Sequence, residues 1–298
     1  MRLGRKRDKN NKISKAKQKN IQNVLIVAKQ NKVGLKSAKK LESMLKDKVA
    51  QINFDRSTAL RLRKIGHSIR KFNGDLIITL GGDGTFLWTA HKTDVPILPV
   101  KLEGQGFLCS CSFKQLLDSI DRVLKKDYTI KERMRLRCSK IAKGKIEKYI
   151  TARRGDYPLA LNEIAFGRKR PSKILNVEFK IDGVVFDMIG DGVMFSTPSG
   201  STAYSSSAGG AMIDPSLEVI GITPLYPFFS KIKPMVVPKD KKIEISIAGG
   251  DCALVIDGHG GEYVKKNSTF MIEAATPVKI VTLFEQNFYE KVKKNLMA

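Results

Sequence analysis

The spacing of apolar residues changes along the chain, and the change divides it near residue 127. In the first part, residues 24–27 and 75–80 are short, largely apolar runs that predict buried strands. Residues 35–49 instead repeat apolar side chains every three or four positions, which predicts an amphipathic helix. Strands and helices that alternate in this way are typical of a parallel sheet with helices on its faces.

Further segments extend this alternation. The pattern predicts a second helix over residues 60–69, a helix opening over 86–91, a strand over 95–100 and one helical face over 113–124. We therefore expect residues 21–127 to form an α/β domain with a parallel sheet.

The second part consists of short β-branched runs bounded by Gly, Pro or Asp, which predict strands. The runs are residues 174–181, 184–189, 192–195, 218–222, 242–247, 252–256, 270–273 and 278–283. Asp182-Gly183 lies between the first two runs and is a hairpin signal. We expect a mostly β domain over residues 128–283, then a segment, 284–298, that forms a short helix and packs back on the protein.

The net charge is +25, because 54 Lys and Arg face 29 Asp and Glu. Residues 1–20 hold nine Lys or Arg against one Asp and predict a disordered basic tail, so the rest of the chain carries +17. A body this basic suggests a polyanionic ligand, either nucleic acid or the phosphates of a nucleotide. A lysine-rich proteome, or the many surface ions of a thermophilic protein, would give the same count, so the charge alone leaves these alternatives open. Aromatic residues make up only 7%, with no RNP-like, KH or zinc-finger pattern, so nucleic acid is the less favoured partner.

Composition also limits the class of protein. With 42% hydrophobic and 28% charged residues, the chain has the balance of a globular protein. No apolar run approaches the roughly 18–20 residues that cross a bilayer, and no secretory signal is visible, so we expect a cytoplasmic protein without membrane contact. The four Cys form no CxxC pair and no ligand series with the three His, so we expect reduced, structural cysteines and no protein-built metal site.

The first candidate site follows the apolar run 75–80 and reads Gly81-Gly82-Asp83-Gly84-Thr85. Glycines let the backbone approach a phosphate closely, and their amide groups can surround its oxygens. A carboxylate repels phosphate, so Asp83 is better interpreted as a base facing a substrate hydroxyl, or as a metal contact. The alternative is a plain turn in which Asp83 bonds its own backbone. A Walker A motif and a GxGxxG fingerprint are both missing, which excludes the ordinary phosphate-loop and dinucleotide-fingerprint classes.

The second candidate site lies in the β-rich part. Asn162-Glu163 interrupts an apolar run, and an amide beside a carboxylate can recognise ribose hydroxyls or a base edge, unless the pair merely faces solvent. Residues 196–210 are dense in hydroxyls and glycines and carry one aromatic, Tyr204, suited to lie against a ring. A flexible linker would have the same composition, but closely flanking apolar runs argue against it.

In combination, the three motifs resemble the NAD kinase family. The family pattern runs GGDGT, then NE, then a DG pair ahead of STPTGSTAYSLSAGG. This chain reads STPSGSTAYSSSAGG over residues 196–210, with two substitutions in fifteen positions. The resemblance covers roughly residues 22–285, and the long motif is highly specific, whereas GGDGT is shared with diacylglycerol and sphingosine kinases.

The resemblance implies a two-domain enzyme, with a Rossmann-like α/β nucleotide-binding domain over residues 21–127, a β-rich NAD-binding domain over residues 128–283 and the site in the cleft between them. It implies transfer of a phosphoryl group from ATP, or from inorganic polyphosphate in some members, to the 2′-hydroxyl of the adenosine ribose of NAD. A divalent metal, Mg²⁺, would arrive with the phosphoryl donor. The family also tends to form dimers and tetramers, so a homo-oligomer is expected.

The family's site residues carry over by position. Asp83 matches the proton acceptor, and Gly81, Gly82, Gly84 and Thr85 match the phosphate-binding loop. The positions that match dinucleotide contacts are Asp83, Gly84, Asn162, Glu163, Lys173, Asp191, Thr202, Ala203, Tyr204, Ser205, Ser206, Ser207 and His259.

The chain departs from the family pattern at three places. An N-x-G-x-x-G-F-L segment is altered at residues 101–105 but keeps Gly106-Phe107-Leu108. His259 replaces a Gln, and Ile189 stands where some members have Arg. Two alternatives therefore stay open: a GGDGT-type lipid kinase, which leaves residues 196–210 unexplained, and a nucleotide- or RNA-binding relative without catalysis, which leaves Asp83 unexplained.

Overall fold

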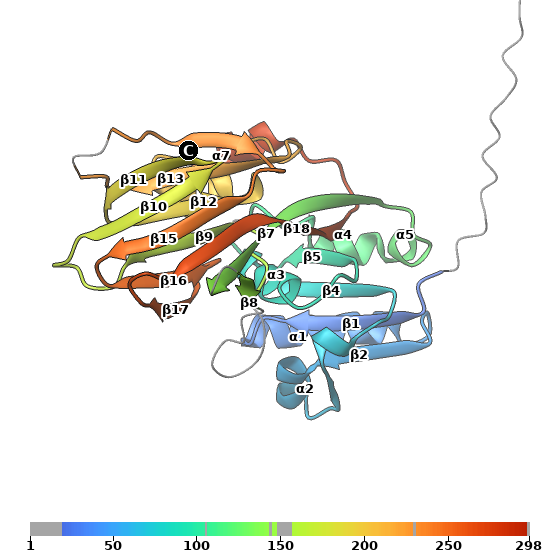
Figure 1. Cartoon of the computed structure of the whole chain (residues 1–298). Helices are drawn as coiled ribbons and strands as arrows, with labels where there is room; N and C mark the ends of the chain where they lie inside the picture. Colours follow the sequence, from blue (N-terminus) through green and yellow to red (C-terminus); the bar gives the residue numbers. More distant parts are fainter. Residues whose placement is uncertain (1–19, 105, 143–144, 148–156, 229–230, 297–298) are drawn as a thin grey trace, which may run out of the picture.

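The structure is a computed structural model and describes residues 20–104, 106–142, 145–147, 157–228 and 231–296 (Figure 1). All but the last residue of the expected basic tail lie outside these ranges. The described residues form two sheets, one of twelve strands and one of six. The larger sheet runs through the whole molecule, because its parallel part and its antiparallel part are hydrogen-bonded to each other.

The parallel part is built by the first third of the chain, as the alternating pattern predicts. Its strands are β1 (Asn23–Ala28), β2 (Gln51–Asp55), β3 (Gly66–His67), β4 (Leu76–Gly81), β5 (Ile97–Lys101) and β6 (Cys111–Ser112). They pair in the order β6-β5-β4-β1-β2-β3, all parallel. The fold class expected from the sequence is therefore confirmed for this part.

Helices cover both faces of this sheet. They are α1 (Lys32–Leu45), α2 (Arg56–Leu62), α3 (Asp83–Ala90), α4 (Phe113–Asp118) and α5 (Ile120–Leu124), with a short 3-10 helix, η1 (Ile69–Lys71). The Asn31 side chain caps α1 by accepting from Gly34 N–H at 2.8 Å, and Ala38, Leu41 and Leu45 bury its apolar face.

Two helix predictions need correction. The helix expected over 60–69 ends at Leu62, because Arg63 takes a left-handed φ of 55° and a strand follows at Gly66. The face expected over 113–124 is split at Ser119, where φ is −117°. A periodic pattern shows which side chains are buried. It does not show whether the helix that carries them is continuous or interrupted.

The rest of the chain forms antiparallel strands, again as expected. They are β7 (Thr129–Ala142), β8 (Lys145–Glu147), β9 (Glu163–Arg168), β10 (Leu175–Ile181), β11 (Val184–Gly190), β12 (Gly192–Ser196), β13 (Val219–Leu225), β14 (Met235–Pro238), β15 (Ile243–Gly249), β16 (Cys252–Ile256), β17 (His259–Val264) and β18 (Thr269–Thr282). The β10–β11 hairpin predicted from Asp182-Gly183 is confirmed, and both residues have positive φ, 49° and 85°. The smaller sheet runs β14-β13-β12-β9-β16-β17 and packs on the antiparallel part of the larger one around Phe166, Phe179 and Phe195.

The last strand, β18, joins the two parts. The sequence suggests two strands, over 270–273 and 278–283, but they are one strand with an irregularity between Ala275 and Val278. β18 pairs with the long strand β7 and also, in parallel, with β5. β7 escapes prediction because it alternates basic with apolar residues. The last element among the described residues, after β18, is helix α7 (Phe288–Leu296).

All four cysteines are buried and free of disulfides. Among the described residues, no helix is long and apolar enough to cross a membrane.

Candidate functional site

The glycine-rich turn lies at the carboxyl end of β4 and opens helix α3. Gly82 is the N-cap residue and Asp83 the first helical residue, so the helix begins three residues earlier than expected. A side chain at Gly81 would meet Thr85 Oγ1 at 2.2 Å, whereas Gly82 and Gly84 have nothing within 4 Å of a Cβ position. The turn is therefore packed on its inner side and open on its outer side, where a ligand can approach the backbone.

The Asp83 carboxylate binds the backbone of the loop that follows β5. Its Oδ2 accepts from Phe107 N–H at 2.7 Å, and its Oδ1 accepts from Leu108 N–H at 3.0 Å. The Cys109 thiol lies 3.7 Å from Oδ1, and burial followed by the Asp83 charge raises the pKa of this thiol to about 12. Asp83 thus fixes the retained Gly106-Phe107-Leu108 segment. Its Oδ1 accepts from both Leu108 and Cys109, whereas Oδ2 accepts from Phe107 alone and keeps a lone pair for another hydrogen.

The C-terminal segment holds the other side of this loop. Lys291 Nζ donates to the Phe107 carbonyl at 2.7 Å, and Gln286 Nε2 donates to the Ser110 carbonyl at 2.5 Å. The rings of Phe107 and Phe288 are in edge-to-face contact, with centroids 6.3 Å apart. Sequence reasoning missed these contacts, because the terminal helix carries no motif.

A buried carboxylate, Asp257, organises the Asn162-Glu163 pair. Its Oδ1 accepts from Asn162 N–H at 2.7 Å and Glu163 N–H at 2.9 Å, and its Oδ2 accepts from Leu161 N–H at 2.8 Å. Oδ2 also lies 2.6 Å from His91 Nε2, directly after α3. Asp257 therefore links helix α3 to the loop that carries the pair. The Asp257-Gly258 dipeptide was the available signal, but the sequence indicated only its neighbour His259.

The side chains of the pair are short of partners. Asn162 Oδ1 and Glu163 Oε2 are buried and have no hydrogen-bond partner among the described residues. Burial, and then the charge of Asp257, raise the pKa of Glu163 to about 7. Buried polar atoms in native proteins almost always have partners, so these two atoms indicate a place for a polar ligand.

The hydroxyl-rich motif packs on the same loop. Thr197 N–H donates to the Asn162 carbonyl at 2.9 Å, and the Thr197 hydroxyl donates to the Leu161 carbonyl at 2.5 Å. A side chain at Gly200 would lie 2.0 Å from the Asn162 carbonyl oxygen, so only glycine fits there. The motif is thus an ordered structure, formed by the 3-10 helix η2 (Ser199–Thr202) and the short helix α6 (Tyr204–Ser207).

The predicted contacts within this motif differ in exposure. Thr202, Ala203 and Ser206 are half-buried, while Tyr204 and Ser207 are exposed. Ser205 is buried, with its hydroxyl 3.1 Å from that of Thr223.

The remaining predicted residues are more scattered. Asp191 is half-buried, and its carboxylate is ion-paired with Arg168 at 3.0 Å. His259 is exposed, with its ring 6.1 Å from that of His91. Lys173 is exposed in a turn before β10, and none of the interactions described above reaches it.

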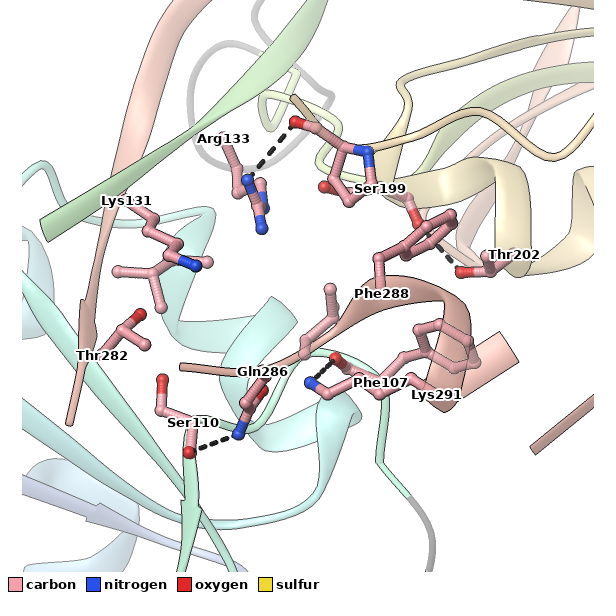
Figure 2. Close-up of a pocket in the computed structure, with 13 residues that line it drawn as sticks. Phe107, Ser110, Lys131, Arg133, Ser199, Thr202, Thr282, Gln286, Phe288 and Lys291 are labelled. Atoms are coloured by element: carbon pink, nitrogen blue, oxygen red, sulfur yellow. Dashed lines mark hydrogen bonds between the residues drawn. The ribbon is translucent and has the colours of Figure 1, made fainter. Parts of the chain in front are cut away.

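A pocket of about 80 Å³ lies between the loop after β5, strands β7 and β18, helix η2 and helix α7 (Figure 2). It is lined by Phe107, Leu108, Ser110, Lys131, Arg133, Ser199, Thr202, Pro215, Ile280, Thr282, Gln286, Phe288 and Lys291. Residues from the first and last parts of the chain therefore meet here, next to the loop that Asp83 binds.

Known proteins match this chain over nearly its whole length. A family model for the ATP-NAD kinase N-terminal domain matches residues 8–128, and one for the C-terminal domain matches residues 161–283. The NAD kinase of Thermococcus kodakarensis is 31% identical over 276 residues, 89% of this chain and 95% of that protein. The NAD kinase of Methanopyrus kandleri is 36% identical over 228 residues, 75% of this chain and 78% of that protein.

Two solved structures are similar in fold. A yeast NADH kinase complexed with NADH has a TM-score of 0.83 at 23% identity, over 94% of this chain and 88% of that one. An Archaeoglobus fulgidus NAD kinase in complex with ATP has a TM-score of 0.71 at 26% identity, over 91% of this chain and 99% of that one.

Proposed function

The chain belongs to the NAD kinase family and phosphorylates NAD, and from this premise we propose which of its residues carry out the reaction. The acceptor is the 2′-hydroxyl of the adenosine ribose. The reaction centre is the open side of the turn at Gly82–Gly84, beside the Asp83 carboxylate. The observation that carries this proposal is the geometry of Asp83, which projects from a helix N-terminus next to two glycines open to a ligand.

Asp83 accepts the proton of the ribose hydroxyl as the phosphoryl group arrives. Both of its oxygens already accept one backbone hydrogen bond, which orients the carboxylate, and Oδ2, which accepts from Phe107 alone, keeps a lone pair for the hydroxyl. The exposed amide groups of the turn and the N-terminus of α3 favour the negative charge of the phosphates. Positioning and charge stabilisation of this kind are most of what phosphoryl transfer needs from a protein.

Asn162 and Glu163 bind the dinucleotide. Their unpartnered oxygens accept hydrogen bonds from ribose or amide groups, which offsets the cost of burying them. Tyr204, half exposed at 52%, has room to lie against a ring of the dinucleotide. The resemblance alone makes further residues candidate contacts, namely Lys173, Asp191, Thr202, Ala203, Ser205, Ser206, Ser207 and His259.

The donor set at the reaction centre fits a magnesium ion that arrives with the phosphoryl donor. Among the described residues, no three His, Cys, Asp or Glu side chains are grouped closely enough to hold a metal. Mg²⁺ is commonly held by one or two carboxylates together with substrate phosphates, and Asp83 is the carboxylate at hand in the turn. When bound, the ion would neutralise part of the phosphate charge.

The donor is ATP or inorganic polyphosphate, the protein is a homo-oligomer, and it works in the cytoplasm.

The proposed reaction is tested by a coupled assay of NADP formation with Mg²⁺, run in parallel with ATP, other nucleoside triphosphates and polyphosphate. Product with at least one donor, abolished in Asp83→Ala, supports the proposal. No product with any donor would leave a dinucleotide-binding protein without catalysis.

A further inference from the structure

Strand β7 carries a row of basic side chains on one face. Lys131, Arg133 and Arg135 are two residues apart, so they point to the same side of the sheet. Arg135 is almost fully buried, and its guanidinium donates to the Asp94 carboxylate at 2.6 Å and to the Ala90 carbonyl at 2.9 Å. The innermost member of the row is therefore fully partnered.

The two outer members differ from Arg135. Lys131 and Arg133 point into the pocket beside Phe107, where Lys291 enters from α7 (Figure 2). All three side chains are half-buried. The ion pairs formed within the described part of the chain involve none of them.

The contacts that these cations do make are to neutral carbonyls. Arg133 donates to the Pro215 carbonyl at 3.3 Å, and Lys291 donates to the Phe107 carbonyl at 2.7 Å. Burial lowers the pKa of Arg133 and of Lys291, because the charged forms lose hydration, and the carboxylates of Asp214 near Arg133 and of Asp83 near Lys291 offset only part of this loss. An anion between the two cations would supply further negative charge.

We propose that Lys131, Arg133 and Lys291 form a binding site for a phosphate group, separate from the reaction centre. A guanidinium fork and two ammonium groups match the oxygens of a tetrahedral dianion. The Ser199 and Thr282 hydroxyls also line the pocket. The cavity volume of about 80 Å³ is enough to admit a phosphate group.

The separation from the reaction centre follows from one peptide group. Leu108 N–H points at Asp83, and the Phe107 carbonyl of the same peptide points at Lys291. The two groups of a trans peptide point in opposite directions, so the carboxylate and the ammonium group lie on opposite sides of the loop.

This arrangement makes the site a regulator of the proposed reaction, on which this part of the inference rests. A bound phosphate competes with the Phe107 carbonyl for Lys291 and so loosens the loop that orients Asp83. Phosphate is therefore an inhibitor that lowers kcat. The natural source is either free phosphate or the phosphate group of a nucleotide.

Calorimetric titration of the full chain with inorganic phosphate, at constant ionic strength, tests binding without any assay of activity. We expect saturable binding that weakens at least about tenfold in Lys131→Met and in Lys291→Gln, because each removes a charge-assisted contact. The matched control is Lys279→Met, an equal loss of charge at an exposed position on the opposite face of neighbouring β18. If Arg133→Met does not fold, Arg133→Lys, which keeps the positive charge, is titrated in its place.

Kinetics then test regulation and identify the source. We expect phosphate to inhibit wild type and Lys279→Met equally, and Lys131→Met several-fold less. Competition between inorganic phosphate and NADP in the titration would identify a nucleotide phosphate as the occupant, and independent binding would identify free phosphate. Equal phosphate affinity in wild type and Lys131→Met, or the same heat from chloride, overturns the proposal. An inactive chain that still binds phosphate would overturn the proposed function and leave this site standing.

Discussion

Replacing Asp257 by Asn removes one oxygen from the most connected buried carboxylate of the site. Three backbone N–H groups and His91 Nε2 meet at this carboxylate. Asparagine keeps one acceptor oxygen, and its NH₂ group faces donors, so at least one buried N–H loses its partner. That loss costs about 1–3 kcal/mol. At roughly 2 °C per kcal/mol in a chain of this size, Tm falls by about 2–6 °C.

The substitution also removes a charge beside Glu163. The pKa of Glu163 is raised to about 7 by burial first and by Asp257 second. Without the Asp257 charge the burial contribution remains, so the pKa falls below 7 but stays above its usual value. If ionised Glu163 binds the dinucleotide, NAD binding improves as pH rises through this pKa, and in Asp257→Asn the improvement begins at lower pH.

The assay is KM for NAD measured across the pH range from mildly acidic to mildly alkaline. We expect a midpoint near the Glu163 pKa in wild type, a lower midpoint in Asp257→Asn, and no such transition in Glu163→Gln. A purely structural role for Asp257 would lower Tm and leave the midpoint in place. An unmoved midpoint in folded Asp257→Asn would refute the electrostatic reasoning.

Four further outcomes are expected. Asp83→Asn lowers kcat roughly 10²–10⁴-fold, and raised Mg²⁺ does not restore it; restoration would identify a metal ligand instead of a base. Asn162→Ala raises KM for NAD more than it lowers kcat, by the roughly 1–3 kcal/mol of a lost buried partner; the reverse split would exclude a binding role. Because folding raises the pKa of Glu163 from 4.5 to about 7, its protonation favours the folded state at low pH, and this contribution disappears as pH rises through about 7. Urea unfolding should therefore show a weaker loss of stability over this range in Glu163→Gln than in wild type. Removing residues 1–20 leaves kcat and KM within about twofold, well under 1 kcal/mol; a tenfold loss would place the tail in the site.

Local patterns predicted the elements whose signals are complete within a few residues. The strand before Gly81, the hairpin at Asp182-Gly183 and the helical periodicity of α1 each depend on neighbours in the chain, so they could be derived without the fold. The same holds for Asp83 as a candidate base. A carboxylate between glycines repels phosphate, so the local sequence already favours contact with a substrate hydroxyl or a metal.

Long-range contacts could not be predicted in this way. Asp257 accepts from residues about 95 positions earlier, and Lys291 reaches a carbonyl 184 positions away. β7 alternates basic with apolar residues, and its inward Lys and Arg become intelligible only once Asp94 and the pocket are seen beside it.

The sequence by itself determined the parallel and antiparallel parts, the family resemblance and the candidate residues for the chemistry, because these follow from side-chain period and local motif. Tertiary structure alone decided that β18 joins the two parts, that Asp83 orients the 107–108 loop, and that Asp257 ties α3 to Asn162 and Glu163. The physical reason is that a hydrogen bond or a charge acts over a few ångströms of space. Chain order does not specify which distant residues come within that range.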